Sequence, residues 1–301
     1  MTRLLFLLFL LGLAACAADP TLPGPLVRGC TLTRQADLPL HIVRNFLLTP
    51  VRLNGTPATL VVDTGAETST LTPEAAAALH LPQDPRHGSV LLGIAGPVRS
   101  ENVRLHRFVI GDIERLDQSL GVGQMPAFPG QRPAVAGLLG ADVLSHYEVD
   151  IDVPNRHMTL YSAVGCDGFR PWPQAMAVPL MRTRSGLSFV NAVVDGRSVR
   201  ALLDTGARTS LIDRRVAGQL GITNAELARD PERRGLGIGM GGIEFRQHVF
   251  GELGLPSATV ANFPANVAEL RLPGVQMLLG ADYLGQRRIW ISYATGRLFL
   301  R

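Results

Sequence analysis

Residues 60–66 read LVVDTGA, and residues 201–207 read ALLDTGA. Each stretch is a short apolar run that ends in Asp-Thr-Gly, and the two aspartates, Asp63 and Asp204, lie 141 positions apart. Glycine adopts backbone conformations that other residues avoid, so the glycine of each stretch allows a tight turn that presents the preceding aspartate. The two stretches therefore predict two apolar strands, each followed by a turn that carries a carboxylate.

Two further landmarks are duplicated at nearly the same spacing. LLGADVL at residues 138–144 returns as LLGADYL at residues 278–284, which is 140 positions later. GIAG at residues 93–96 corresponds to GMGG at residues 239–242, which is 146 positions later. Landmarks that move together along a chain indicate an internal repeat. We therefore expect a tandem duplication.

The duplication divides the chain into two lobes, which we place at residues 45–162 and 186–301. Between them, residues 163–185 are rich in Gly and Pro and are expected to connect the lobes. The chain has 32 Gly and 21 Pro, which favours many turns and a mostly β fold. Stretches that mix β-branched with polar residues and end in turn signals are expected to be strands, such as 59–62, 98–110 and 149–160.

A short helix is expected after each Asp-Thr-Gly turn. The first is predicted at residues 73–81, with Pro73 at the first helical position, where proline is tolerated. The second is predicted at residues 213–220, with Asp213 as its N-cap. The helices therefore belong to the repeated unit.

An apolar strand that ends in Asp-Thr-Gly resembles the active-site turn of aspartic proteases, and the wider pattern resembles their retropepsin-like branch. In that branch an Asp-Thr-Gly-Ala turn is followed by a glycine-rich flap and then by an apolar-apolar-Gly segment that packs behind the turn. All three occur in this order in both lobes. The resemblance implies two β-barrel lobes related by a pseudo-twofold axis. Retroviral enzymes are homodimers of one lobe, so pairing of the lobes within one chain and pairing between chains both stay open.

The resemblance also assigns a role to each landmark. It implies that Asp63 and Asp204 form the catalytic dyad, and that the duplicated 138–140 and 278–280 segments are structural supports. The residues that would support the active-site turns are Thr64, Gly65, Thr205 and Gly206. The residues that would form the substrate-covering flaps are Gly93, Ile94, Ala95 and Gly96 in the first lobe and Gly239, Met240, Gly241 and Gly242 in the second.

Peptide hydrolysis by water gives a chemical reason for two carboxylates. One group must remove a proton and another must donate one. Two carboxyl groups that share a proton do both, because like charges at that separation raise one pKa and lower the other. We therefore predict an aspartic endopeptidase that acts on a peptide or protein with water as the nucleophile and no cofactor. The alternative is a catalytically silent lipoprotein that binds peptides or envelope components.

Other patterns in the sequence are not expected to contribute to catalysis, metal binding or nucleic-acid binding. Asp142 and Asp282 are also duplicated, but they precede short helix-like stretches, so we expect them to be N-caps or to bond to the neighbouring backbone. The seven histidines form no i,i+4 pair and the cysteines no Cys-x-x-Cys, so no metal site is predicted. All 29 basic residues are arginines, and they are scattered along a chain with only 6% aromatic residues. We predict no nucleic-acid partner.

Ala66 and Ala207 follow the glycines of the two turns, where pepsin-like enzymes usually carry Ser or Thr. A hydroxyl group at this position can donate a hydrogen bond to the carboxylate and lower its pKa. Without that hydroxyl the dyad should protonate more readily. We therefore expect activity at weakly acidic to near-neutral pH.

Residues 1–15 are typical of an export signal, with one basic residue followed by an apolar run too short to span a bilayer permanently. The Leu-Ala-Ala-Cys string that ends at Cys16 resembles a bacterial lipobox, which implies cleavage before Cys16 and a lipid thioether on it. Ala17 then implies sorting to the outer membrane, facing the periplasm, with residues 16–44 as a tether and lead-in. The alternative is an ordinary secretory signal and a soluble periplasmic or secreted protein.

Cys30 and Cys166 remain as an even pair if Cys16 carries a lipid. In an oxidising compartment such a pair is expected to form a disulfide. Two unpaired, buried cysteines are the alternative. For the assembled protein we expect a monomer with an internal pseudo-dimer of lobes, and the alternative is a homo-oligomer in which like lobes pair between chains.

Overall fold

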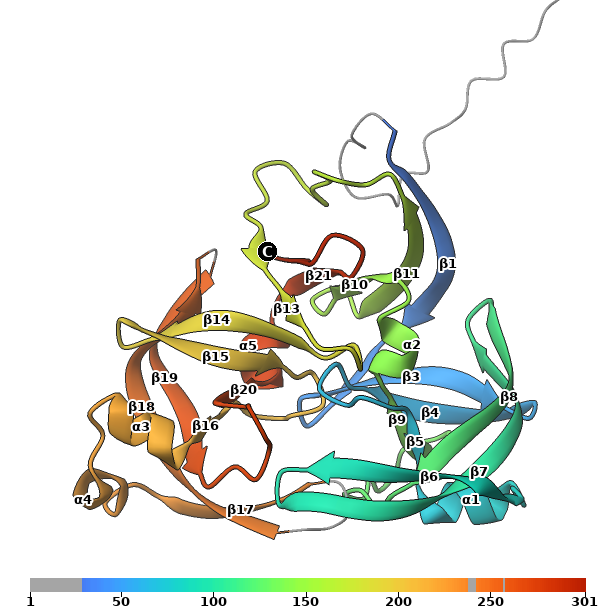
Figure 1. Cartoon of the computed structure of the whole chain (residues 1–301), viewed down its shortest axis with the longest axis horizontal. Helices are drawn as coiled ribbons and strands as arrows, with labels where there is room; N and C mark the ends of the chain where they lie inside the picture. Colours follow the sequence, from blue (N-terminus) through green and yellow to red (C-terminus); the bar gives the residue numbers. More distant parts are fainter. Residues whose placement is uncertain (1–28, 238–241, 257) are drawn as a thin grey trace, which may run out of the picture.

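The computed structural model describes residues 29–237, 242–256 and 258–301. Two lobes lie side by side, and a third sheet lies at the top of the view in Figure 1. The predicted mostly β fold is confirmed, and the protein consists of two tandem lobes with equivalent strand order. No helix in the described part of the chain is long and apolar enough to cross a membrane.

The first lobe is built on an eight-stranded sheet of order β2-β3-β4-β9-β5-β8-β7-β6. A short helix follows β5, and another follows β9. The elements are β2 (His41–Val43), β3 (Phe46–Leu53), β4 (Thr56–Val62), β5 (Thr70–Leu71), α1 (Pro73–Ala78), β6 (Gln83–Gly93), β7 (Gly96–Ile110), β8 (Ile113–Val122), β9 (Val135–Leu139) and α2 (Ala141–Leu144).

The second lobe repeats this arrangement strand for strand, in the order β13-β14-β15-β20-β16-β19-β18-β17. It has one additional short helix, α4, which precedes its flap. The elements are β13 (Met181–Arg182), β14 (Ser188–Val194), β15 (Arg197–Leu203), β16 (Leu211–Asp213), α3 (Arg214–Gln219), α4 (Asn224–Leu227), β17 (Glu232–Leu236), β18 (Gly242–Leu255), β19 (Ala258–Ala268), β20 (Met277–Leu279) and α5 (Ala281–Leu284).

A six-stranded sheet joins the lobes and takes three strands from each half of the chain, in the order β1-β11-β10-β21-β22-β12. Its central pair, β10 and β21, is antiparallel, with Asp150 opposite Trp290. The Arg288 guanidinium binds the Asp150 carboxylate across this pair. The strands are β1 (Thr31–Pro39), β10 (Glu148–Asp152), β11 (His157–Val164), β12 (Val178–Pro179), β21 (Arg288–Ser292) and β22 (Arg297–Leu300).

Local sequence explains the hairpins on which the lobes are built. Asn54 and Gly55 connect β3 to β4 with φ values of 49° and 84°, and Asp195 and Gly196 connect β14 to β15 with φ values of 47° and 76°. Asn-Gly and Asp-Gly are the dipeptides that favour positive φ at both turn positions, and such a turn matches the twist of the flanking strands. Both lobes therefore begin with the same tight hairpin.

Several predicted elements have different boundaries in the structure. The stretch 149–160 is not one strand, because a turn at residues 153–156 separates β10 from β11. The predicted lead-in contains β1 and β2, and the predicted connection 163–185 contributes β12 and β13. Helix α1 ends at Ala78 and is capped by Thr72, whereas α3 is capped by Asp213 as expected. Cys16 and residues 1–15 lie outside the described residues.

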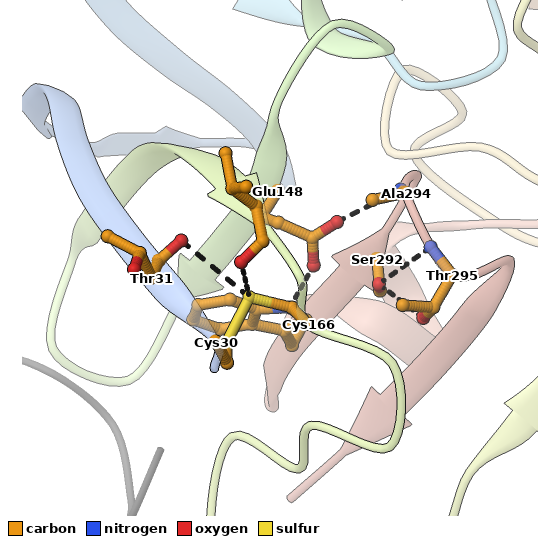
Figure 2. The surroundings of a disulfide bond; sticks show 9 residues. Cys30, Thr31, Glu148, Cys166, Ser292, Ala294 and Thr295 are labelled. Atoms are coloured by element: carbon orange, nitrogen blue, oxygen red, sulfur yellow. Dashed lines mark hydrogen bonds between the residues drawn. A yellow bond between two sulfur atoms is a disulfide. The ribbon is translucent and has the colours of Figure 1, made fainter. Parts of the chain in front are cut away.

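A disulfide joins Cys30, just before β1, to Cys166, just after β11. Figure 2 shows this bond beside Glu148, whose buried carboxylate accepts hydrogen bonds from Trp290 Nε1 and from the Ala294 backbone N–H. The two cysteines belong to a buried cluster that also contains Phe169, Trp172, Trp290 and Phe299. The disulfide therefore holds the connection between the lobes against the aromatic face of the shared sheet.

Replacing both cysteines should destabilise the protein. The disulfide links residues 136 positions apart, and closing a loop of this length lowers the entropy of the unfolded chain enough to contribute about 5 kcal/mol. We expect a Cys30→Ser/Cys166→Ser variant to lose several kcal/mol of unfolding free energy, measured by urea denaturation with tryptophan fluorescence. Reductant should destabilise the wild type to a similar level and leave the variant unchanged. Equal stability of the two proteins without reductant would contradict the prediction.

Candidate active site

The two Asp-Thr-Gly turns meet at the centre of the molecule. Strand β4 pairs in parallel with β9, and β15 pairs in the same way with β20. The pairing continues into the turns, because the Asp63 N–H donates to the Leu139 carbonyl and the Asp204 N–H donates to the Leu279 carbonyl, at 3.0 and 3.1 Å. The duplicated apolar-apolar-Gly segments thus anchor the backbone of each aspartate, as the resemblance implied.

Two buried threonines connect the turns across the lobe boundary. Thr64 Oγ1 donates to the Leu203 carbonyl, and Thr205 Oγ1 donates to the Val62 carbonyl, each at 2.7 Å. Each hydroxyl oxygen also accepts a hydrogen bond from the other threonine's backbone N–H at 3.1 Å. Both side chains are fully buried. The hydroxyl group and the backbone N–H of each threonine therefore have their partners in the opposite lobe.

Each carboxyl group packs against the glycine of the opposite turn. A Cβ atom added to Gly65 would lie 2.4 Å from Asp204 Cγ, and one added to Gly206 would lie 2.2 Å from Asp63 Cγ. Neither glycine has a positive φ, so the sequence-based reason for these glycines, a turn that only glycine adopts, is wrong. They are required because any side chain would occupy the space of the facing carboxyl group.

The environment of the carboxyl groups favours protonation. Burial raises the pKa of Asp63 from 3.8 to about 6, although the N–H groups of Gly65 and Ala66 and a hydrogen bond with Asp204 oppose the rise. Burial and the negative charge of Asp63 raise the pKa of Asp204 well above its ordinary value. The expectation that one pKa falls is therefore wrong, because desolvation raises both. Both carboxyl groups therefore keep their protons to higher pH than an exposed aspartate does.

Asp142 and Asp282 support the turns from behind. Asp142 Oδ1 accepts hydrogen bonds from the backbone N–H and the hydroxyl of Ser69 at 2.7 and 2.8 Å. Asp282 accepts the equivalent pair from Ser210, both at 2.7 Å. The N-caps of α2 and α5 are glycines, so the N-cap expectation is wrong. Bonding to the neighbouring backbone is confirmed for Asp282, which also accepts a hydrogen bond from the Tyr283 N–H at 2.9 Å, whereas Asp142 bonds to Ser69, 73 positions away.

The two serines are supporting residues that the sequence comparison missed. Each serine hydroxyl accepts a hydrogen bond from the glycine N–H of the duplicated apolar-apolar-Gly segment, at Gly140 in one lobe and Gly280 in the other. The repeat in fact extends beyond Ala66 and Ala207, because both lobes continue with Thr-Ser two residues later. Extending the alignment of the lobes by three residues would have identified them.

The first glycine-rich turn lies at the tip of the hairpin formed by β6 and β7, which reaches towards β17 of the other lobe in Figure 1. Gly93 pairs with Gly96 in the last strand pair before the turn, and Ile94, in the turn itself, packs on a buried apolar cluster of the second lobe. The Ile94 carbonyl accepts a hydrogen bond from the Arg271 N–H at 3.4 Å. In the second flap, Gly242 begins β18, whereas Gly239, Met240 and Gly241 lie outside the described residues.

A cleft of about 880 Å³ lies between the turns and the flaps. Both aspartates line it, together with apolar side chains from the two lobes. The large apolar residues on its walls include Phe46, Phe128, Leu138, Leu187, Phe189, Phe245, Leu272 and Leu278. No group of three His, Cys, Asp or Glu side chains in the described residues could hold a metal ion. The arrangement places two proton-sharing carboxyl groups in an apolar cleft with room for an extended peptide.

A comparison with protein families identifies the family to which this chain belongs. No curated protein sequence matches the chain. Among solved structures, a retropepsin-like aspartic protease from Rickettsia conorii is similar at 19% sequence identity, with 42% of this chain and 91% of that chain covered and a TM-score of 0.33. A family model described as aspartyl protease matches residues 49–143 and 190–283, one segment in each lobe. These segments make up more than half of the sequence, and the chain therefore belongs to the aspartyl protease family.

Proposed function

We propose that the protein is an aspartic endopeptidase in which Asp63 and Asp204 activate a water molecule for attack on a peptide bond. The observation that carries the proposal is the contact of each carboxyl group with the glycine of the opposite turn. This contact brings two titratable groups from different lobes into one apolar cleft, where they share a proton. A protein that only binds peptides gains nothing from such a pair, because burying two like charges costs free energy.

The mechanism follows from the unequal protonation of the pair. Asp63, with a pKa of about 6, is the group that ionises first, and Asp204 retains its proton to higher pH. The ionised carboxylate removes a proton from water while the protonated carboxyl group donates one to the peptide carbonyl oxygen. The peptide nitrogen then takes a proton from the pair as the bond breaks. Because the two groups titrate together, these assignments describe one proton shared by the pair.

The substrate is proposed to be a peptide segment in extended form. The cleft has mainly apolar walls and is lined in part by the flap hairpin of the first lobe, and the strands of a flap can pair with an extended backbone. In the structure the two lobes face one another within one chain, so we propose a monomer with an internal pseudo-dimer as the active unit. The substrate peptide would then enter between β17 and the β6–β7 hairpin.

Removing either carboxylate should abolish turnover. Asp63→Asn and Asp204→Asn keep the shape of the side chain but remove the shared proton, so we expect kcat to fall by at least about 10²–10⁴-fold. The measurement is mass spectrometry of an unbiased peptide mixture incubated with purified protein. Asp112→Asn, at an exposed turn far from the cleft residues, is the matched control. Cleavage that survives both substitutions would refute the peptidase.

The pH optimum of kcat/KM should lie above the strongly acidic range. Activity requires one proton on the pair, so kcat/KM should rise as Asp63 ionises near pH 6 and fall at higher pH as Asp204 loses its proton. Ala66→Ser introduces a hydroxyl that can stabilise the carboxylate, so the rising limb should move to lower pH. A wild-type profile confined to strongly acidic pH, or no movement in the variant, would contradict this assignment.

We propose that the protein is exported and held at the outer membrane by a lipid on Cys16, facing the periplasm. The support is the sequence alone, because Leu-Ala-Ala-Cys ends at residue 16 and follows an apolar run. Metabolic labelling with a radioactive fatty acid should label the wild type, and Cys16→Ala should remain unlabelled and uncleaved. Labelling that persists in the variant, or a wild type recovered soluble without label, would exclude the anchor.

A further inference from the structure

The walls of the cleft carry an unequal distribution of charge. Apart from the two aspartates, Glu67 is the only carboxylate among the described residues that line it. Four arginines line it as well: Arg44, Arg208, Arg233 and Arg234. The cleft is therefore basic even when one member of the dyad is ionised. Three of the four arginines belong to the second lobe, so the two ends of a bound peptide meet different charges.

The strongest difference lies immediately beside the dyad. Glu67 and Arg208 occupy equivalent positions, four residues after the aspartate of each turn. The Glu67 carboxylate accepts a hydrogen bond from the Ser185 hydroxyl at 2.7 Å. Arg208 Nε donates to the Arg44 carbonyl at 2.9 Å, and its guanidinium lies 5.9 Å from the centre of the Phe46 ring. Arg208 is thus held in place by one nitrogen and one aromatic contact, which leaves its terminal nitrogens available.

The two flaps also differ in charge, and the flap of the second lobe is the more basic one. Arg233 lies opposite Phe245 in the β17–β18 pairing, and side chains at opposed positions share a face of the sheet. Phe245 lines the cleft, so Arg233 is on the cleft face of the second flap. Arg234 also lines the cleft, but its guanidinium pairs with Glu244 at 2.8 Å. The first flap instead presents Val90 and other apolar side chains to the cleft.

Two of these arginines, Arg208 and Arg233, lack acidic partners in the described part of the chain. Neither Arg208 nor Arg233 has a carboxylate oxygen within 4 Å there. Arg233 donates one hydrogen bond to the Glu232 backbone carbonyl at 3.2 Å. Both arginines are solvent-exposed, so their guanidinium groups are accessible to a ligand. A guanidinium group binds a carboxylate through two parallel hydrogen bonds.

We propose that the cleft selects peptide segments that carry an acidic side chain beside apolar ones, and that Arg208 and Arg233 determine this specificity by binding the substrate carboxylate. The inference rests on the proposed peptidase for its effect on turnover, but the binding preference is independent of catalysis. A basic side chain at the same subsites is rejected, because it would meet unpaired like charges. The apolar residues of the substrate occupy the pockets formed by the aromatic and leucine side chains of the cleft.

The test is a peptide mixture that contains matched members differing only by Glu or Gln. Wild-type protein should cleave the Glu members about tenfold faster at one or two subsites. In Arg208→Gln and Arg233→Gln the ratio of Glu to Gln cleavage should fall towards one. Arg229→Gln removes an exposed arginine of the same lobe that does not line the cleft, so the ratio should match the wild type. A wild-type ratio near one, or a ratio unchanged in both cleft variants, would overturn the proposal.

A binding experiment separates this inference from the proposed activity. The same mixture is passed over immobilised Asp204→Asn protein, and retained peptides are counted by mass spectrometry. We expect Glu members to be retained over Gln members by about tenfold, and this preference should disappear when Arg208→Gln and Arg233→Gln are added. If the wild type cleaves nothing while this preference is present, the peptidase fails and the acidic specificity stands. Equal retention of both members, or no retention, overturns the specificity whatever the activity.

Discussion

The architecture depends on the hydrogen bonds that Thr64 and Thr205 exchange across the lobe boundary. Each threonine satisfies a donor and an acceptor of the opposite lobe in a fully buried position. Separating the turns would break these four hydrogen bonds, and each buried polar group left without a partner costs about 1–3 kcal/mol. The turns are therefore held at one fixed separation. At that separation each carboxyl group lies so close to the glycine of the opposite turn that the glycine has no room for a side chain.

Fixing the turns creates an electrostatic cost that the fold must support. Two carboxyl groups in an apolar cleft both lose hydration, and the charge on one opposes ionisation of the other. Hydrogen bonds around the turns offset this cost. Asp142 and Asp282 accept hydrogen bonds from the serines behind the turns, and carbonyl groups of the neighbouring parallel strands accept hydrogen bonds from the backbone N–H groups of the two catalytic-turn aspartates. The two buried carboxyl groups are thus surrounded by backbone and side-chain groups that have hydrogen-bond partners.

Duplication made the two halves alike in backbone but left their surfaces free to diverge. Every strand of the first lobe has a counterpart in the second, including the pairing of β3 with β7 and of β14 with β18. The side chains that line the cleft do not follow this symmetry, because Glu67 of the first lobe corresponds to Arg208 in the second. A symmetric framework suits the chemistry, which requires two equivalent acids. An asymmetric lining suits a substrate, because a peptide has a direction.

The sequence by itself determined the duplication, the mostly β fold and the two aspartates, because strand periodicity, Asp-Thr-Gly and the spacing of landmarks are local patterns that repeat. It also identified Asp213 as a helix cap and paired Cys30 with Cys166, because capping and cysteine counting need no long-range geometry. Only the tertiary structure decided why Gly65 and Gly206 are glycines, since that reason is a carboxyl group 139 or more positions away in the other lobe. The same holds for the raised pKa of both aspartates and for the basic wall around Arg208. Burial and proximity between lobes are properties of the folded chain, and no window of sequence contains them.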